Sequence, residues 1–419
     1  MQYVNCSDNI TIRGGDKNAM LNDHQKMLLA IVQNALWSKT IELENYDWES
    51  IACLAKQQGV LWMLYPGLKN KKECVPEKLL KEWRSVMHSG LMYNEQLTTF
   101  QEELFAWLEK NSIRAVVLKG TSCSRYYPYP SLRPLGDIDI LIDHENMALV
   151  AEYLISAGFH ASETQHGFHI GYYRGEIIVE VHYRCSELPE NEGTQAAILE
   201  EKRFLDCREI AKYDELAFPI LSASHQALML LMHMERHMQE DGIGLRQLCD
   251  WAVFVYGSDS RHWHETIPLL KSCGLFIYAE VITMSCVKYL GLAASYAPWI
   301  KTVDEKTVEA FVEDIFRGGN LGVANEHHVG SLFTDRRLMG TQEHGILKGM
   351  LTKMKSLAFR KWPITQKYAF LLPICYLYIP IEYVIMSFVN PKSRRNVITA
   401  IHLSRRRRKL YYALHLFEP

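Results

Sequence analysis

The stretch from Arg114 to Ile142, RAVVLKGTSCSRYYPYPSLRPLGDIDILI, decides the fold. It opens with a short apolar run rich in β-branched side chains, which is typical of a buried strand. It closes with DIDILI, where acidic and aliphatic residues alternate with the period of two that a strand shows. On such a strand Asp137 and Asp139 project from one face, and the isoleucines between them point into the core. The stretch therefore predicts two strands, the second carrying a pair of carboxylates.

Paired carboxylates repel each other, and a divalent cation is the usual reason for placing them together. The alternative is a strand with one solvated face, since Asp-x-Asp patterns are common. A later strand-like run, Ile178–His182 (IVEVH), offers Glu180 as a third carboxylate for a two-metal site. If Glu180 shares a metal with the aspartates, it has to lie within roughly 6 Å of them. Oxygen donors of this kind suit Mg²⁺ or Mn²⁺.

The residues between the two strands are candidates for binding phosphate. Gly120 follows the first strand and allows the backbone to approach a phosphate, with amides and the Thr121 hydroxyl as donors. Arg125 and Arg133 are further candidates because guanidinium groups bind phosphate. Lys119 fits the same role, but a structural lysine at the rim of the site fits the pattern equally well.

His182 lies two residues after Glu180 and therefore shares its strand face. It is a candidate catalytic residue: a general base, a substrate contact or a partner that orients the acids. A structural histidine that serves only packing explains the pattern as well.

Helical periodicity flanks this region on both sides. Residues 20–112 repeat apolar positions every three or four residues, and Asn22 and Asp47 can cap the first two helices. Further elements are predicted as a helix at 145–157, strands at 166–173 and 176–183 joined at Arg174-Gly175, helices at 222–239 and 245–255, and helical structure generally from about residue 190. We expect an α+β, predominantly helical fold whose small mixed sheet is flanked by N- and C-terminal helical regions.

The composition narrows the choice of partners and compartment. The chain has 419 residues and a formal net charge of −2, so no global field attracts nucleic acid, and we expect no nucleic-acid partner. Its ten cysteines include no Cys-x-x-Cys pair, which argues against a zinc site built on cysteine and is typical of free thiols in the cytoplasm. The first twenty residues show no signal-peptide pattern. We therefore expect a cytoplasmic protein.

Two C-terminal features leave membrane contact open. Residues 368–389 (YAFLLPICYLYIPIEYVIMSFV) are long enough to span a bilayer, but they include Glu382 and two prolines. Buried helices, contact with the membrane interface and a true span remain alternatives. The basic run at 404–409 (SRRRRK) predicts either a continued helix or contact with an anionic membrane or nucleic acid. Peripheral contact with the inner face of the membrane is therefore one expectation.

The sequence also resembles a known family. LKGTSCSRYYPYPSLRPLGDIDILID, followed by the EVHYR strand, resembles a largely uncharacterised bacterial nucleotidyltransferase family with a Leu-Lys-Gly…Arg…Asp-Ile-Asp signature. This family lies within the DNA-polymerase-β-type nucleotidyltransferase superfamily. The resemblance extends from about Trp48 to Leu292 and includes LRQLCDWA at 245–252. The chain departs from the superfamily pattern in having Thr121 in place of serine and Glu180 in place of aspartate.

The resemblance implies a fold, an activity and a site. It implies a nucleotidyltransferase core with Asp137, Asp139 and Glu180 as metal ligands. The implied reaction moves NMP from an NTP to a hydroxyl-bearing acceptor, which could be a small molecule, a glycan precursor or a protein, and releases pyrophosphate. Helices after the sheet wall the nucleotide pocket in such enzymes, so the resemblance makes nucleotide-binding candidates of His233, Arg246 and Asp250. Their alternative is a polar network between helices, in which Arg246 and Asp250, four residues apart, pair with each other.

These expectations divide the chain into five segments: a disordered or polar tail at 1–19, a helical region at 20–112, a nucleotidyltransferase core at 113–187, a helical pocket wall at 188–300 and a C-terminal helical region at 301–419. Two other functions remain open. One is a catalytically weak nucleotide-binding or scaffold protein associated with cell-envelope or peptide biosynthesis. The other is a phosphotransferase that uses the same acids on the γ-phosphate.

Overall fold

The structure of the chain is a computed structural model. It describes residues 21–39, 46–68, 71–162, 167–185, 188, 192–213, 216–240, 242–301 and 303–320. Toward the C-terminus it describes residues 354–389, apart from 356–357, 360 and 363, and residues 406–418. The predicted tail at 1–19 lies outside these residues. The division of the chain into the five segments expected from its sequence stays a proposal.

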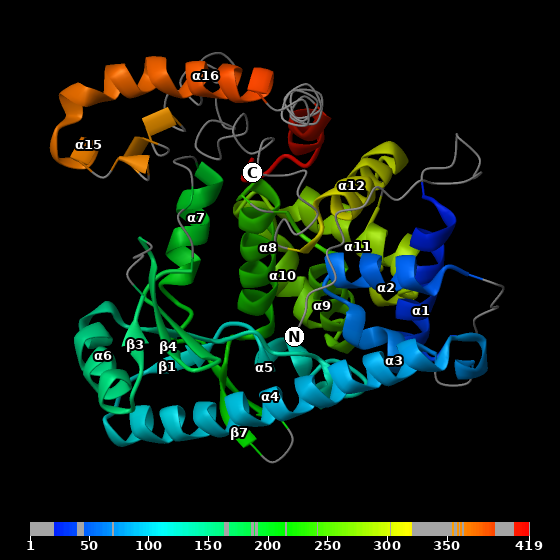
Figure 1. The fold of residues 1–419 in the computed structure, drawn as a ribbon. Helices are drawn as coiled ribbons and strands as arrows, with labels where there is room; N and C mark the ends of the chain where they lie inside the picture. The colour runs from blue at the N-terminus through cyan, green and yellow to red at the C-terminus, as the bar shows by residue number, and fades with distance from the viewer. Residues whose placement is uncertain are drawn as a thin grey trace.

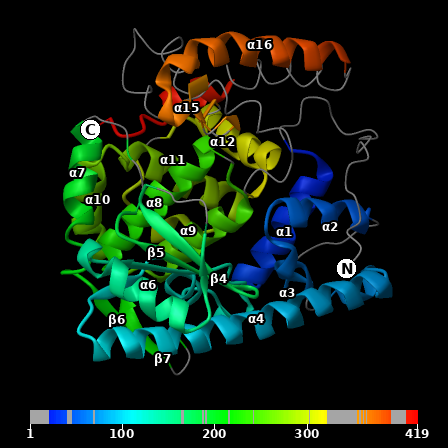
Figure 2. The same cartoon turned by 60° about the vertical axis from the view of Figure 1, so that its left-hand side comes forward.

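The N-terminal region is helical, as predicted. Asn22 and Gln25 form a reciprocal capping box at the start of the first helix, and the Asp47 side chain accepts a hydrogen bond from the Ser50 amide at the start of the second. The helices are α1 (Asp23–Trp37), α2 (Trp48–Gln57), α3 (Leu64–Gly67) and α4 (Glu77–Lys110). The long α4 runs beneath both the sheet and the helical part of the molecule (Figures 1 and 2).

A seven-stranded mixed sheet follows, in the order β3-β4-β5-β2-β1-β7-β6. Its strands are β1 (Ala115–Val117), β2 (Ile138–Ile142), β3 (His160–Ala161), β4 (His169–Arg174), β5 (Ile177–His182), β6 (Glu209–Tyr213) and β7 (Leu216–Ile220). At its centre, β2 pairs antiparallel with β1 and parallel with β5, and the register places Asp139 opposite Glu180. The sheet therefore brings the predicted acids onto adjacent strands.

The β6–β7 hairpin corrects the prediction that the chain is helical from about residue 190. β7 pairs parallel with β1 through Val117 and Ile220, and β6 lies at the edge of the sheet. Phe218 and Ile220 are buried against Val117, so the packing partner comes from a segment a hundred residues earlier. The predicted β4–β5 hairpin is confirmed. Its turn lies one residue later than expected, because Arg174 pairs with Ile177.

The sheet packs differently on its two faces. Ile138, Ile140 and Ile142 point into a core shared with α4 and with α6 (Met147–Ser156). Leu141, on the opposite face, belongs to a larger core made with the later helices. These helices are α5 (Thr121–Ser124), α7 (Glu192–Glu201), α8 (Ala223–Glu240), α9 (Leu245–Gly257), α10 (His262–Ser272), α11 (Phe276–Leu290) and α12 (Glu305–Gly318). Asp139 alternates with the isoleucines along β2 and therefore shares the second face with Leu141.

The basic run near the C-terminus forms a helix at 406–413, in agreement with one of the two predictions made for it. Arg406 forms an ion pair with Glu313, and Arg407 forms an ion pair with Asp314, both on α12. Tyr411 donates a hydrogen bond to the Met238 carbonyl oxygen. The C-terminal end is thereby part of the main core.

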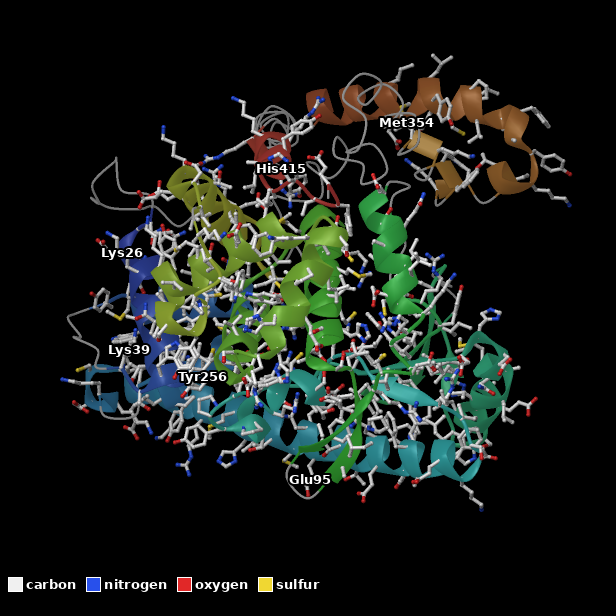
Figure 3. The ribbon with its side chains drawn as sticks, turned by 180° about the vertical axis from the view of Figure 1, so that it is seen from behind. Lys26, Lys39, Glu95, Tyr256, Met354 and His415 are labelled. Carbon is white, nitrogen blue, oxygen red and sulfur yellow. The ribbon has the colours of Figure 1, made fainter. Side chains whose placement is uncertain are left out.

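The apolar stretch at 368–389 forms α16 (Leu372–Val389), preceded by the short α15 (Ile364–Lys367). Only one side of this stretch is buried: Leu372, Cys375 and Ile379 pack in a small core, whereas Phe370 is 74% exposed and Leu377 is 71% exposed. Figure 3 shows Met354, which packs near α16, at the side of the molecule opposite Glu95 of α4. Among the described residues, no helix is both long enough and apolar enough to cross a lipid bilayer.

Candidate functional site

Three carboxylates from two neighbouring strands converge on one face of the sheet. Asp137 directly precedes β2, Asp139 lies within it, and Glu180 lies opposite Asp139 on β5. Each offers an oxygen atom, and these atoms all lie within 4.8 Å of one another. This separation meets the condition set from the sequence, that Glu180 lie within roughly 6 Å of the aspartates. Asp139 is fully buried, whereas Asp137 and Glu180 are half-buried.

Two nitrogen-bearing side chains, those of Lys119 and His182, contact these acids. The Lys119 Nζ atom lies 2.8 Å from Asp139 Oδ1, and the His182 Nε2 atom lies 3.3 Å from the same oxygen. His182 Nε2 also lies 3.3 Å from Glu180 Oε2. Burial opposes a charge on either group. The carboxylates nevertheless raise the pKa of Lys119 and, through hydrogen bonds from its ring, the pKa of His182. Lys119 therefore serves as a counter-charge to the acids, and the acids favour the protonated form of the His182 ring.

The three acids respond differently to this environment. Burial, and after it the neighbouring Asp139 carboxylate, raises the pKa of Asp137 to about 6. Burial also works against ionisation of Glu180, but the hydrogen bond from His182 and the charge of Lys119 lower its pKa to about 2. The pKa of Asp139 is likewise lowered, because Lys119 and His182 outweigh its burial. Asp137 is thus the acid least compensated by the protein.

The backbone after β1 turns sharply at Gly120, whose φ of +68° favours glycine. A Cβ atom at this position would stand 3.4 Å from the Asp137 carbonyl oxygen, closer than most such contacts. Thr121 is buried, and its hydroxyl donates to Gln101 Oε1 at 3.1 Å. Gly120 therefore lines the site, while the Thr121 hydroxyl is directed away from it into α4.

A cavity of about 190 Å³ opens above the acids. Asp137 and Glu180 line its acidic side together with Lys119, and α8 and α9 form its other wall. The α8 and α9 residues that line the cavity are Leu230, His233, Met234, Arg236, His237, Arg246, Gln247 and Asp250. The pocket thus combines a carboxylate end with a wall rich in cationic and imidazole groups, as expected for a site that takes an anionic ligand together with a metal ion.

Arg133 and Asp250 form a buried ion pair that builds this wall. Arg133 donates from Nε to Asp250 Oδ1 at 2.8 Å and from a terminal nitrogen to Oδ2 at 2.7 Å. The Tyr127 hydroxyl donates to the same carboxylate at 2.7 Å. Asp250 therefore pairs with Arg133 and not with Arg246, the alternative that spacing along the helix suggested.

The structure assembles most of the predicted site residues but not all of them. Arg125 lies outside the cavity lining, where its guanidinium donates to the Ser122 carbonyl oxygen and contacts the Tyr126 ring. Arg236 and His237 line the cavity although they were not predicted as site residues. One signal was available, because the lining residues Leu230, His233, Met234 and His237 repeat at the three- and four-residue spacing of a single helix face.

The acids fit a hard divalent cation. Three carboxylates offer the oxygen donors that Mg²⁺ and Mn²⁺ prefer. Asp139 Oδ2 is buried and has no hydrogen-bond partner among the described residues. A buried oxygen atom without a protein partner calls for an explanation, and a bound ion or water is one that fits this acidic site.

Comparisons with known proteins identify the family. No curated protein matches the sequence. Among solved structures, the chain is similar to a crystal structure of an antigenic nucleotidyltransferase-like protein from Paracoccidioides brasiliensis, with 13% identity and a TM-score of 0.30, over 49% of this chain and 97% of that chain. Residues 44–291 match the family described as uncharacterised nucleotidyltransferases. That match covers more than half of the chain and includes all the candidate site residues, so the chain belongs to this nucleotidyltransferase family.

Proposed function

We propose that the chain transfers NMP from an NTP to a hydroxyl group of an acceptor and releases pyrophosphate. The observation that carries this proposal is the convergence of Asp137, Asp139 and Glu180 within 4.8 Å beside a wall of cationic side chains. A small molecule, a glycan precursor or a protein side chain would serve as the acceptor. We propose no nucleic-acid partner, given the net charge of −2.

Asp137, Asp139 and Glu180 would hold the divalent metal, Mg²⁺ or Mn²⁺. When bound there, the metal would neutralise phosphate charge and lower the pKa of the attacking hydroxyl. The unpartnered Oδ2 atom of Asp139 supports this assignment, because a metal ion would supply the partner that the described residues do not.

The phosphate chain would lie along the cationic wall. Lys119 borders both the acids and the cavity, and Arg236 and Arg246 face the cavity from α8 and α9. Charge-assisted hydrogen bonds from these groups would orient the phosphates. His233 also lines the cavity, and burial followed by the charge of Lys119 lowers its pKa well below the usual value, so it would offer a neutral ring to the nucleotide.

His182 and Arg133 would act by positioning other groups. The Nε2 atom of His182 is directed toward Asp139 and Glu180, so while no ion is bound to its ring we assign it the role of orienting the acids rather than that of a general base. Both oxygens of Asp250 bind Arg133, so these two residues would hold α9 against the loop that precedes β2.

The test uses NTPs labelled at the α- or the γ-phosphate, incubated with the purified chain, Mg²⁺ and candidate acceptors. We expect the α-label to enter the acceptor. The Asp139→Asn variant should reduce the rate at least a hundredfold, since it removes a metal ligand. The matched control is Asp143→Asn, because Asp143 pairs with Arg114 at the far end of β2, outside the cavity. Transfer of the γ-label would show a phosphotransferase, and equal products from parent and Asp139→Asn would exclude a role for the acids.

We also propose that α16 contacts the surface of an anionic membrane. Ile374, Leu377 and Ile381 of α16 are each more than half exposed, and they repeat every three or four residues along one face. Phe370, in the turn just before α16, is exposed as well. Lys355 and Lys367 are exposed nearby. An exposed apolar face with adjacent lysines is typical of helices that lie in a membrane interface.

A further inference from the structure

We propose that His169, Glu180 and His182 form a second metal site, which binds a transition-metal ion such as Zn²⁺ or Co²⁺ in preference to Mg²⁺. This site lies beside the three acids and shares Glu180 with them. The inference extends the proposed function, but metal binding can be measured without any transfer reaction.

The strand register places the three side chains on one face. His169 of β4 lies directly opposite His182 of β5, and directly opposed residues in an antiparallel pair project to the same side. Glu180 lies two residues before His182 and shares that side. Asp139 lies opposite Glu180 on the next strand, so the proposed site and the aspartates occupy adjacent strands of one surface.

The distances between donor atoms suit a single ion. His182 Nε2 lies 3.3 Å from Glu180 Oε2, and His169 Nε2 lies 3.8 Å from Glu180 Oε1. Donor atoms from all three residues lie within 4.8 Å of one another. Zinc–nitrogen bonds of about 2.0–2.1 Å in a tetrahedral site place neighbouring donors about 3.3–3.4 Å apart, so binding of an ion would draw the donors together by at most about 1.5 Å.

The donor types separate this site from the acid cluster. Two imidazole nitrogens and one carboxylate favour Zn²⁺, Co²⁺ or Fe²⁺, whereas three carboxylates favour Mg²⁺ or Mn²⁺. Glu180 has two oxygens, and a carboxylate that bridges two ions is compatible with the spacing of about 3.5–4 Å in two-metal centres. The chain would therefore hold unlike ions at neighbouring positions.

Both histidines are buried, and Glu180 connects them to the cavity. His169 is 6% exposed and His182 is 2% exposed, so neither is a surface residue that would bind metals nonspecifically. Glu180 borders the cavity above the acids and is the part of the site that solvent reaches. An ion would enter along the same route as the nucleotide.

The competing explanation is that both imidazoles only donate hydrogen bonds to the carboxylates. Glutamine in place of histidine separates the two explanations, because its amide can still donate a hydrogen bond but is a poor metal ligand. His160→Gln is the matched control, since His160 is an exposed histidine on β3 of the same sheet.

The experiment titrates the metal-free full-length chain with Co²⁺ and follows visible absorption, with metal content determined by elemental analysis. We expect a tightly bound Co²⁺ whose spectrum shows nitrogen ligation and survives excess Mg²⁺. His169→Gln and His182→Gln should each weaken binding at least tenfold, whereas His160→Gln and Asp137→Asn should retain the spectrum. Circular dichroism confirms that each variant is folded.

A second measurement needs no variant. In the parent chain with isotope-labelled histidine, Co²⁺ should shift two histidine ring signals strongly through its unpaired electrons. Absence of such shifts, or equal Co²⁺ affinity in parent and His169→Gln, would overturn the second site. If the parent chain binds Co²⁺ with the expected spectrum but transfers no NMP in the presence of Mg²⁺, the proposed function would be wrong and the second metal site would stand.

Discussion

Asp137 and Glu180 line the same cavity, yet the protein moves their pKa values in opposite directions. His182 and Lys119 favour the charged form of Glu180, whereas burial and the adjacent Asp139 carboxylate favour the protonated form of Asp137. A bound cation would remove the disadvantage of charged Asp137, because it supplies the missing positive charge. Above about pH 6 Asp137 is ionised, and a metal ion would then bind the acids best. In the same pH range the metal-free site is least stable, because the charge of Asp137 is not compensated.

This imbalance predicts a pH-dependent stability of the metal-free protein. The pKa of Asp137 is about 6 in the folded chain and about 3.9 in an unfolded one, so its stabilising contribution is complete below about pH 4 and is lost as the pH rises through 6. Urea unfolding in EDTA should show that Asp137→Asn removes about 3 kcal/mol of this decline, since each tenfold change in the protonation equilibrium corresponds to about 1.4 kcal/mol.

The control for this prediction is Glu180→Gln, which should leave the decline between pH 4 and 6 in place. Glu180 has a lowered pKa of about 2, so its own contribution is present above about pH 4.5 and is lost only as the pH falls toward 2. If the parent and Asp137→Asn gave parallel profiles between pH 4 and 6.5, the account of Asp137 would be wrong.

The Arg133–Asp250 pair gives a second residue-scale prediction. Arg133→Met or Asp250→Ala should each lower the free energy of unfolding by about 3–5 kcal/mol, because each leaves a buried charge without its partner. The double variant should cost less than the sum of the two single variants. Lys81→Ala, which breaks the exposed Lys81–Glu77 pair, should change stability little. Additive losses in the double variant would contradict a direct interaction.

At the scale of elements, a helix or strand could be predicted when the sequence pattern that specifies it lies within its own residues. The β2 strand and α1 were predictable because alternation and a cap lie within their own residues. The β6–β7 hairpin was not, because β7 is stabilised by β1, a hundred residues away in sequence. The same distinction between local and long-range signals explains which parts of the site could be predicted. The acids of β2 and β5 were predictable from strand spacing, but the partner of Asp250 depends on how α9 packs against the loop before β2.

The prediction at the scale of elements concerns nucleotide binding by α9. The Nε atom of Arg246 is buried without a hydrogen-bond partner among the described residues, while Asp250 one turn later binds Arg133. Arg246→Met should weaken binding of a non-hydrolysable NTP about tenfold or more, as measured by calorimetry, because a charged hydrogen bond contributes about 1.5–3 kcal/mol. Arg125→Met is the matched control, since Arg125 lies outside the cavity. Equal weakening by both variants would show a nonspecific effect of charge.

At the scale of the whole molecule, one face of the sheet packs in a core and the other carries the candidate site. One face is covered by α4 and α6 with a mainly apolar core, whereas the other carries the acids and meets α8 and α9. The C-terminal helix at 406–413 is tied to α12 and to Met238 of α8, so its arginines Arg406 and Arg407 are engaged within the protein. These two arginines are therefore less available to lipid, and we consider α16 the better candidate for membrane contact (Figure 1).

The membrane prediction rests on the exposed face of α16. The full chain should float with vesicles that contain anionic lipid at low salt, and high salt should weaken this binding because part of the attraction comes from lysines. Replacing both Ile374 and Leu377 by glutamate should reduce vesicle binding at least about tenfold, since each buried aliphatic side chain contributes about 1.5–3 kcal/mol. The matched control places glutamate at Leu149 and Ile155, two exposed aliphatic positions on α6. If the parent did not bind vesicles at low salt, or if both double variants lost binding equally, α16 would have no specific role at a membrane, and its exposed face would need a protein partner instead.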